Sequence, residues 1–376
     1  MNDMAVQVAV LDGFGLDLQE VGANFSSNAS RMLSGLSIPS GSAGLLASLS
    51  TPFENFKATL SAAHEQDLTN LASYQTNLAT ASREFQGTDH VAAQAISTLS
   101  SSGLSDLAVA GNNMVSGGLT RFTGLQLPTL PLVEDEQFTV RQVVESAVQS
   151  LMHFDEPLSR AIGIKPAADY LVPLAADWEA LETLGGRIRQ LGFNDFVASE
   201  NLSSGVRWLQ GNWTGGAGEA FASTASRLAQ AVAVRSSDLD VVSKIIANGA
   251  ACLERLVYNQ AMGWSSGLSQ PLSMLGFTLP LGAWAQLIDR PMSQSNKSQI
   301  VSAVDTLKAA SDARRDAITT MIGKISRALE YTPGSTAPVY SAAEYEVPDK
   351  VIADLGTTRY GYGNNVWWEA SLASPA

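Results

Sequence analysis

One stretch of the sequence marks a turn between two long helices: Trp208-Leu-Gln-Gly-Asn-Trp213-Thr-Gly215-Gly-Ala217-Gly-Glu-Ala220-Phe221. The glycine pair that follows Trp213 breaks a helical pattern, and small residues with an aromatic residue then begin a new one. We therefore predict a helical hairpin whose corner is anchored by the Trp213 indole.

Apolar residues recur at helical spacing on both sides of this corner. Neither helix can bury its apolar stripe alone, so the two helices should pack antiparallel across the turn. After the corner the stripe alternates steps of four and three residues, as in a coiled-coil seam, and Arg235 and Gly249 occupy the two skipped places. The stripes are Phe221, Ala225, Leu228, Val232, Leu239, Val242, Ile246, Leu253 and Leu256 after the corner, and Leu174, Trp178, Leu181, Ile188, Leu191, Leu202, Val206 and Leu209 before it.

The order and spacing of the residues around the corner resemble a known family. Asn-Leu near the end of the first helix, then Trp-x-Gly, then small residues and an aromatic residue are the pattern of the WXG helical-hairpin proteins. These proteins are exported by type VII secretion systems of actinobacteria and firmicutes. The match covers roughly residues 168–263 and comprises Asn201-Leu202, Trp213-Thr-Gly215, Ala217, Ala220 and Phe221.

The N-terminal part of the chain, residues 1–103, predicts a second hairpin that lacks a tryptophan. One helix is expected over about 8–34, followed by a break rich in Gly, Ser and Pro at 35–44. The next helix should begin near Thr51-Pro52, with Thr51 as N-cap, and run towards residue 103. This part resembles the Trp-less relatives of the same family, so the chain is expected to be a tandem of hairpins.

The family resemblance also implies a secretion signal of the form Tyr-x-x-x-Asp/Glu. Two copies follow the last predicted helix, Tyr340 to Glu344 and Tyr345 to Asp349, although tail tyrosines without such a role are the alternative. Phe85 to Asp89 has the same spacing but carries Phe in place of Tyr. Its alternative interpretation is that Phe85 closes the apolar stripe and Asp89 is solvated.

The remaining segments complete a division into four parts. A linker is expected at 104–136 because it contains glycines, prolines and an acidic run. The second hairpin domain, 137–331, should contain a helix at 139–153, a proline-containing connection through Pro157 and Pro166, and a last helix from about 298. The apolar, loop-like residues after 263 form either a packed flap or an interaction surface. An irregular tail, 332–376, follows because its prolines forbid a continuous helix.

Charge and composition exclude several classes of partner. The formal net charge is −13, which argues against nucleic acid or an anionic membrane as the main partner. No stretch is a clean membrane span, since Leu268 to Ile288 contains two prolines. The first residues lack the basic and apolar regions of a cleaved secretory signal, so any export is expected to be independent of one. The single cysteine, Cys252, lies beside the apolar seam and is expected to be a buried side chain.

No pattern in the sequence indicates catalysis. His64, His90 and His153 do not have metal-ligand spacing, and no nucleotide-binding loop or nucleophile motif is found. We therefore expect no enzyme activity, no catalytic residue, no cofactor and no metal.

These observations predict an all-α protein: an elongated helical bundle of two antiparallel hairpins with an extra C-terminal helix and an irregular tail. The resemblance implies a secreted substrate or secretion-associated factor of a type VII (ESX-like) system that acts through protein–protein contacts. It would be made in the cytoplasm, recognised by the export ATPase, and found outside the cell or in the cell envelope. A small WXG protein or a second copy is a further possible partner. The alternatives are a toxin-delivery module without its toxin domain and a cytoplasmic adaptor for a small WXG protein.

Overall fold

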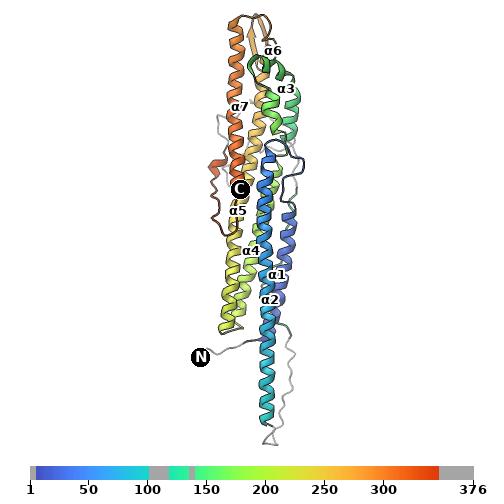
Figure 1. Cartoon of the computed structure of the whole chain (residues 1–376), viewed down its shortest axis with the longest axis vertical. Helices are drawn as coiled ribbons and strands as arrows, with labels where there is room; N and C mark the ends of the chain where they lie inside the picture. Colours follow the sequence, from blue (N-terminus) through green and yellow to red (C-terminus); the bar gives the residue numbers. More distant parts are fainter. Residues whose placement is uncertain (1–5, 101–117, 135–139, 347–376) are drawn as a thin grey trace. The chain divides into compact units, whose positions relative to one another are not determined.

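The computed structural model describes residues 6–100, 118–134 and 140–346. These residues are mostly helical, which confirms the predicted all-α class (Figure 1). The helices are α1 (Val8–Ser34), α2 (Ser50–Ser100), α3 (Val140–Ile162), α4 (Ala180–Gln210), α5 (Gly216–Ser269), α6 (Leu281–Gln286) and α7 (Gln294–Ala328). Short 3-10 or π turns occupy Leu46–Leu49, Pro166–Leu171, Val172–Leu174 and Ala342–Tyr345.

The contacts within the chain divide it into two compact units. The first contains residues 1–33, 59–131 and 190–239, and the second contains 34–58, 132–189 and 240–376. Each unit thus contains residues from before and after 104–136, the segment that the composition predicts to be a linker.

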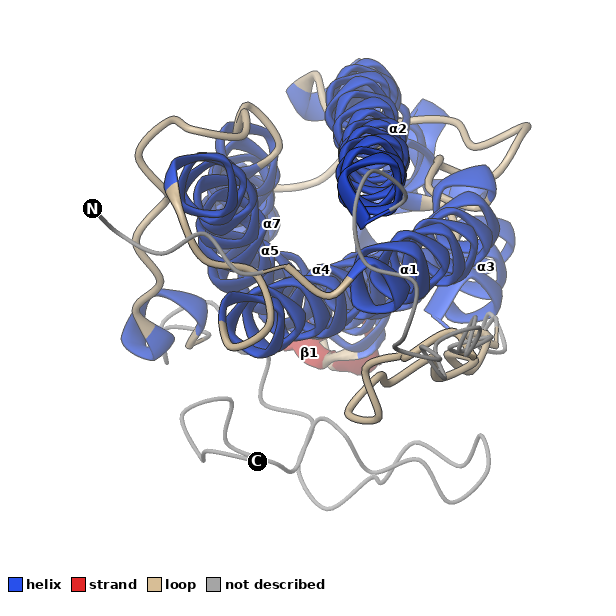
Figure 2. Ribbon diagram, turned by 90° about the horizontal axis from the view of Figure 1, so that it is seen from below, coloured by secondary structure: helices blue, strands red, loops and turns tan. Residues whose placement is uncertain are grey.

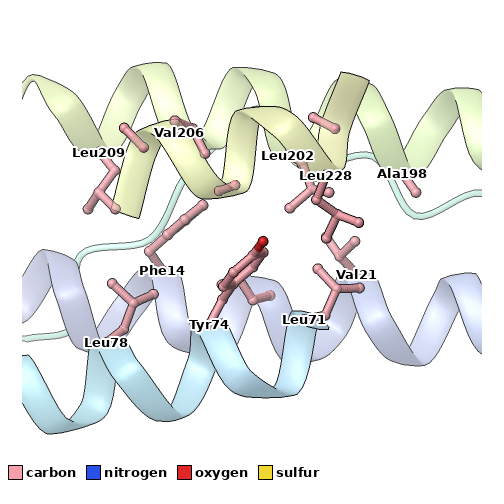
Figure 3. Packing of buried hydrophobic residues seen from close by; sticks show 14 of the residues in the cluster. Phe14, Val21, Leu71, Tyr74, Leu78, Ala198, Leu202, Val206, Leu209 and Leu228 are labelled. Atoms are coloured by element: carbon pink, nitrogen blue, oxygen red, sulfur yellow. The ribbon is translucent and has the colours of Figure 1, made fainter. Parts of the chain in front are cut away.

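The first unit has a helical core to which α1, α2, α4 and α5 all contribute. Figure 3 shows apolar side chains from these helices facing one another, with the Tyr74 ring among them. The Tyr74 hydroxyl donates a hydrogen bond of 3.1 Å to the Thr224 carbonyl oxygen, so its polar end is satisfied. The labelled members of the core are Phe14, Val21, Leu71, Tyr74, Leu78, Ala198, Leu202, Val206, Leu209 and Leu228.

The second unit is built around buried tryptophans. Trp178 donates its indole N–H to the Leu174 carbonyl oxygen at 2.8 Å, and Trp284 donates to the Leu272 carbonyl oxygen at 2.7 Å. Gly249 of α5 lies against Ile325 of α7, where an added Cβ would approach to 2.9 Å. This skipped place in the α5 seam is therefore a point of close helix packing.

A short antiparallel strand pair follows α5 and is drawn red in Figure 2. Its strands are β1 (Pro271–Met274) and β2 (Phe277–Pro280), and Met274 is paired with Phe277. Leu275 and Gly276 form the two-residue turn with φ values of 53° and 80°. Positive φ at both positions is the requirement of a type I′ turn. The sequence-based interpretation of an irregular apolar loop missed these strands, because each is only four residues long.

The expected loop-like region begins later than predicted, because α5 continues to Ser269. The packed-flap interpretation holds for the buried residues after α5, but not for the turn. Leu275 is 62% exposed and Phe277 is 67% exposed. The buried members after α5 are Met274, Leu281, Trp284 and Ile288, whereas Trp264 and Leu268 are buried within α5 itself.

Three local predictions in the second unit were wrong. Pro157 lies inside α3 and not in a connection, because its neighbour Leu158 is fully buried and helix packing offsets the lost hydrogen bond. Trp178 precedes α4 in a turn that its own indole hydrogen bond closes. Thr51 is not an N-cap, since α2 begins at Ser50 and continues directly from a 3-10 turn.

Candidate functional site

The corner after α4 is held by backbone contacts on both sides of Trp213. The Trp213 amide donates to the Leu209 carbonyl oxygen at 2.8 Å, which closes the end of the helix. Val6 pairs with Trp213 in an isolated antiparallel β-bridge, and the Gln7 amide donates to the Asn212 carbonyl oxygen at 3.2 Å. Gly215 has a φ of 99°, a conformation that L side chains rarely adopt. The Trp-x-Gly pair therefore shapes the backbone of the turn.

Aromatic side chains converge on this corner within the first unit. The Phe221 ring of α5 lies 5.8 Å from Trp213, 5.7 Å from Tyr74 and 6.4 Å from Phe14, measured between ring centroids. Trp208 lies 6.0 Å from Phe14. Tilted and edge-on pairs at these separations are favourable arrangements of aromatic rings. The corner is consequently one packed cluster that joins α1, α2, α4 and α5.

The Trp213 indole contributes packing only. It is 5% exposed, and its Nε1 has no hydrogen-bond partner among the described residues. A buried N–H without a partner lowers stability, so the shape of the ring must be the reason for its presence.

Asn201, part of the family-like Asn-Leu pair, holds an extended segment against α4. This segment, residues 118–131, is called the strap here. Asn201 Oδ1 accepts a hydrogen bond of 2.9 Å from the Gln126 amide, and its Nδ2 donates to the Gln126 carbonyl oxygen at 2.6 Å. The side-chain amide thus satisfies both backbone groups of one strap residue.

Asn28 of α1 makes a similar pair of contacts further along the strap. Its Oδ1 accepts from the Leu130 amide at 3.2 Å, and its Nδ2 donates to the Pro128 carbonyl oxygen at 3.0 Å. Asp17 accepts from the Phe122 amide at 2.8 Å. Sequence reasoning found Asn201 through the family resemblance but missed its partner, because composition alone indicates a linker there.

Three buried charged side chains and one histidine form a second polar cluster in the first unit. Arg235 Nε lies 2.7 Å from Asp195 Oδ2, and its Nη2 lies 2.7 Å from Asp67 Oδ2. His64 Nε2 lies 3.2 Å from Asp195 Oδ1, and the ring stacks on Phe25 at 4.9 Å. The skipped place at Arg235 in the apolar seam is therefore filled by an ion pair.

The pKa values of the two carboxylates in this cluster shift in opposite directions. Burial alone would raise the pKa of Asp195, but the Arg235 charge and the adjacent His64 ring hold that pKa below its usual value. Burial raises the pKa of Asp67 because the attraction of Arg235 does not fully compensate it. Asp195 is 0% exposed and Arg235 is 5% exposed, so this ion pair belongs to the packed interior of the first unit.

The tail motif is held on α7 in the second unit. Lys324 Nζ lies 2.8 Å from Glu344 Oε2, donates to the Glu344 carbonyl oxygen at 3.1 Å, and lies 5.5 Å from the centre of the Tyr345 ring. Tyr345 is 3% exposed and stacks on Tyr340 at 5.5 Å. Burial also raises the pKa of Tyr345. The structure thus brings together three of the four tail residues that the sequence indicates, and Asp349 lies outside the described residues.

Phe85 and Asp89 both lie within α2. Phe85 is half-buried and packs against the core of the first unit, as expected if it closes the apolar stripe. The side chain of Asp89 is outside what the structure describes.

Three further features of the described residues concern metal ligands, membrane spans and the single cysteine. Among those residues no group of three or more His, Cys, Asp or Glu side chains is placed to hold a metal ion. No described helix has the length and apolar character needed to cross a bilayer. Cys252 is buried, and burial raises the pKa of its thiol to about 11.

Comparison with family models, with curated proteins and with solved structures gives no match.

Proposed function

We propose that the protein is a secreted substrate or secretion-associated factor of a type VII system and acts through protein–protein contacts. The observation that carries the proposal is the corner after α4. Four residues of the family-like pattern have separate structural tasks there. Asn201 holds the strap, Gly215 allows the turn, and Trp213 with Phe221 fills the aromatic cluster.

The proposed architecture is a tandem of a Trp-less hairpin and a Trp-x-Gly hairpin. In such a tandem the two hairpins pack on each other and supply within one chain the four-helix bundle that small family members form as dimers. The shared core of α1, α2, α4 and α5 supports this arrangement. A separate small WXG partner is then not needed to cover the apolar stripes.

The proposed export signal is the tail motif, with Tyr340 and Glu344 as its leading residues and Tyr345 and Asp349 as its second copy. It follows the last long helix, and Lys324 holds Glu344 close to α7. Phe85 to Asp89 is the weaker candidate because Phe85 packs against the core. The export ATPase is the proposed partner, and the exported protein is placed outside the cell or in its envelope.

Fractionation of the native host with and without its secretion ATPase tests this proposal. The expected result is protein in the culture filtrate or envelope of the intact strain and its retention in the cytosol when the ATPase is deleted. Protein that stays wholly cytosolic in both strains would contradict the proposal.

The signal is tested in the same assay with Tyr340→Ala and Glu344→Ala. Neither residue is fully buried, so the fold should be retained, whereas Tyr345→Ala would also remove buried packing. Val339→Ala and Ser341→Ala are matched controls because both side chains are exposed neighbours. Export of both signal variants at the level of the controls would remove the tail motif from the proposal.

A further inference from the structure

The outer face of α4 carries two exposed phenylalanines next to each other. Phe193 is 49% exposed and Phe196 is 48% exposed, and their ring centroids lie 6.2 Å apart. Residues three apart on a helix share a face, so the two rings form one apolar patch. Adjoining exposed aromatic rings are typical of a contact surface, because water solvates them poorly.

Charged residues flank this patch on the same face. Arg189 lies four residues before Phe193, and Glu200 lies four residues after Phe196. Glu182 and Arg207 each lie a further seven residues outward, which is close to two helical turns. All four charged side chains are exposed. The face therefore reads Glu, Arg, Phe, Phe, Glu, Arg along one helix.

This order is complementary to itself when it is reversed. In an antiparallel pair of α4 helices whose two-fold axis passes between positions 194 and 195, Phe193 faces Phe196 of the second helix. Arg189 then faces Glu200 of the second helix, and Glu182 faces Arg207. A parallel pair in register would instead place each charge against its own copy.

We propose that this face of α4 binds the same face of a second copy of the chain, antiparallel and about a two-fold axis. Such an isologous contact uses one patch twice, so each charge pair occurs twice. The face contains two Glu and two Arg residues and is neutral, whereas the chain carries a formal charge of −13. Two copies repel each other least when neutral faces meet. The phenylalanines supply apolar contact area, and the charges fix direction and register.

Analytical ultracentrifugation of the full chain over a range of concentrations tests this contact. The unmodified chain is expected to show a monomer–dimer equilibrium below about 100 µM, and the Phe193→Ser/Phe196→Ser variant is expected to remain monomeric there. A chain that is wholly monomeric at that concentration, or a double Phe variant that still dimerises equally well, would overturn the proposal.

Charge reversal tests the two-fold pairing itself. Arg189→Glu alone and Glu200→Arg alone each place like charges together at two symmetric points and should weaken the dimer by about tenfold or more. The double variant Arg189→Glu/Glu200→Arg exchanges the signs, restores both pairs, and should recover most of the affinity. A double variant as weak as the single variants would contradict an antiparallel contact.

Control substitutions separate this effect from changes in fold or net charge. Arg83→Glu reverses an exposed charge on α2, and Phe277→Ser removes an exposed aromatic ring from β2. Both are expected to dimerise like the unmodified chain. Circular dichroism should show equal helicity in every variant, and dimer loss with the control substitutions as well would exclude a contact specific to α4.

Discussion

Arg235 shows why one position interrupts an otherwise apolar seam. Its guanidinium bridges two buried carboxylates, Asp67 and Asp195, while His64 faces Asp195 from the other side. The sequence identified the interruption of the seam but not the partners. Asp67 precedes Arg235 by more than 160 residues, and a pattern within one helix carries no information about such a distant contact.

Replacement of Arg235 by Met should be strongly destabilising. The variant retains most of the side-chain volume but leaves Asp195 buried without its cation, so we expect a loss of about 3–5 kcal/mol in the free energy of unfolding. Urea denaturation followed by circular dichroism measures it. The exposed Arg83→Met is the control and should change stability by less than about 0.5 kcal/mol. Equal effects of the two substitutions would contradict a buried ion-pair network.

Asp195 should also make stability depend on pH in the acid range. Its pKa is lower in the folded state than in the unfolded chain, so its contribution is present above the unfolded value, near about 4. That contribution is lost as the pH falls through the lower folded value. The raised pKa of Asp67 acts in the opposite sense and offsets part of the effect. Urea denaturation between about pH 3 and 7 should give a weaker acid dependence for Asp195→Asn than for the unmodified chain. Parallel curves would show that Asp195 does not contribute.

At the scale of elements, long periodic helices could be predicted and short or non-periodic features could not. The expected helix at 8–34 coincides with α1, and the helix expected from about 51 begins one residue earlier as α2. Periodicity over many turns makes such segments unambiguous. Pro157 indicated a break because local propensity opposes proline in a helix, but tertiary packing overrides that preference. The strap was missed because its hydrogen bonds come from side chains of other elements.

The contact of the tail with α7 predicts protection from proteolysis. Lys324→Ala removes the ion pair with Glu344 and the contact with the Tyr345 ring, so cleavage by chymotrypsin at Tyr340 and Tyr345 should become several-fold faster. Mass spectrometry of timed digests measures the rates. Lys308→Ala removes a comparable pair with Asp312 on α7 and is the control. Unchanged cleavage in Lys324→Ala would mean that this residue does not hold the tail.

At the scale of the whole molecule, the sequence predicts the fold class better than it predicts which segments pack into the same compact unit. The all-α class follows from helical periodicity, which is a local property. The two compact units combine segments far apart in the chain, as Asn28 and Leu130 illustrate. A division read in chain order, with a linker at 104–136, cannot contain this information. The tail residues were found because their motif is contiguous.

A chain truncated after residue 331 should still fold but should no longer be exported. The described part of the tail adds the burial of Tyr345 and its contacts with Lys324, so its removal should lower the free energy of unfolding by only about 1–3 kcal/mol. Circular dichroism should show the remaining helices intact, while host fractionation should show loss of export. A truncated chain that is unfolded, or one that is exported normally, would contradict this prediction.

The residue at the first position of the turn between β1 and β2 is not the one that would make the turn most stable. Leu275 adopts a left-handed backbone conformation that disfavours its branched side chain, and that side chain is largely exposed. Asparagine fits this position of a type I′ turn better, so Leu275→Asn should raise the free energy of unfolding by up to about 1 kcal/mol in a urea titration. A decrease would show that Leu275 has contacts that compensate for its conformation. An increase would mean that Leu275 keeps the turn less stable than asparagine would make it. Such a leucine is expected where the exposed tip of the turn contacts another molecule and selection acts on that contact.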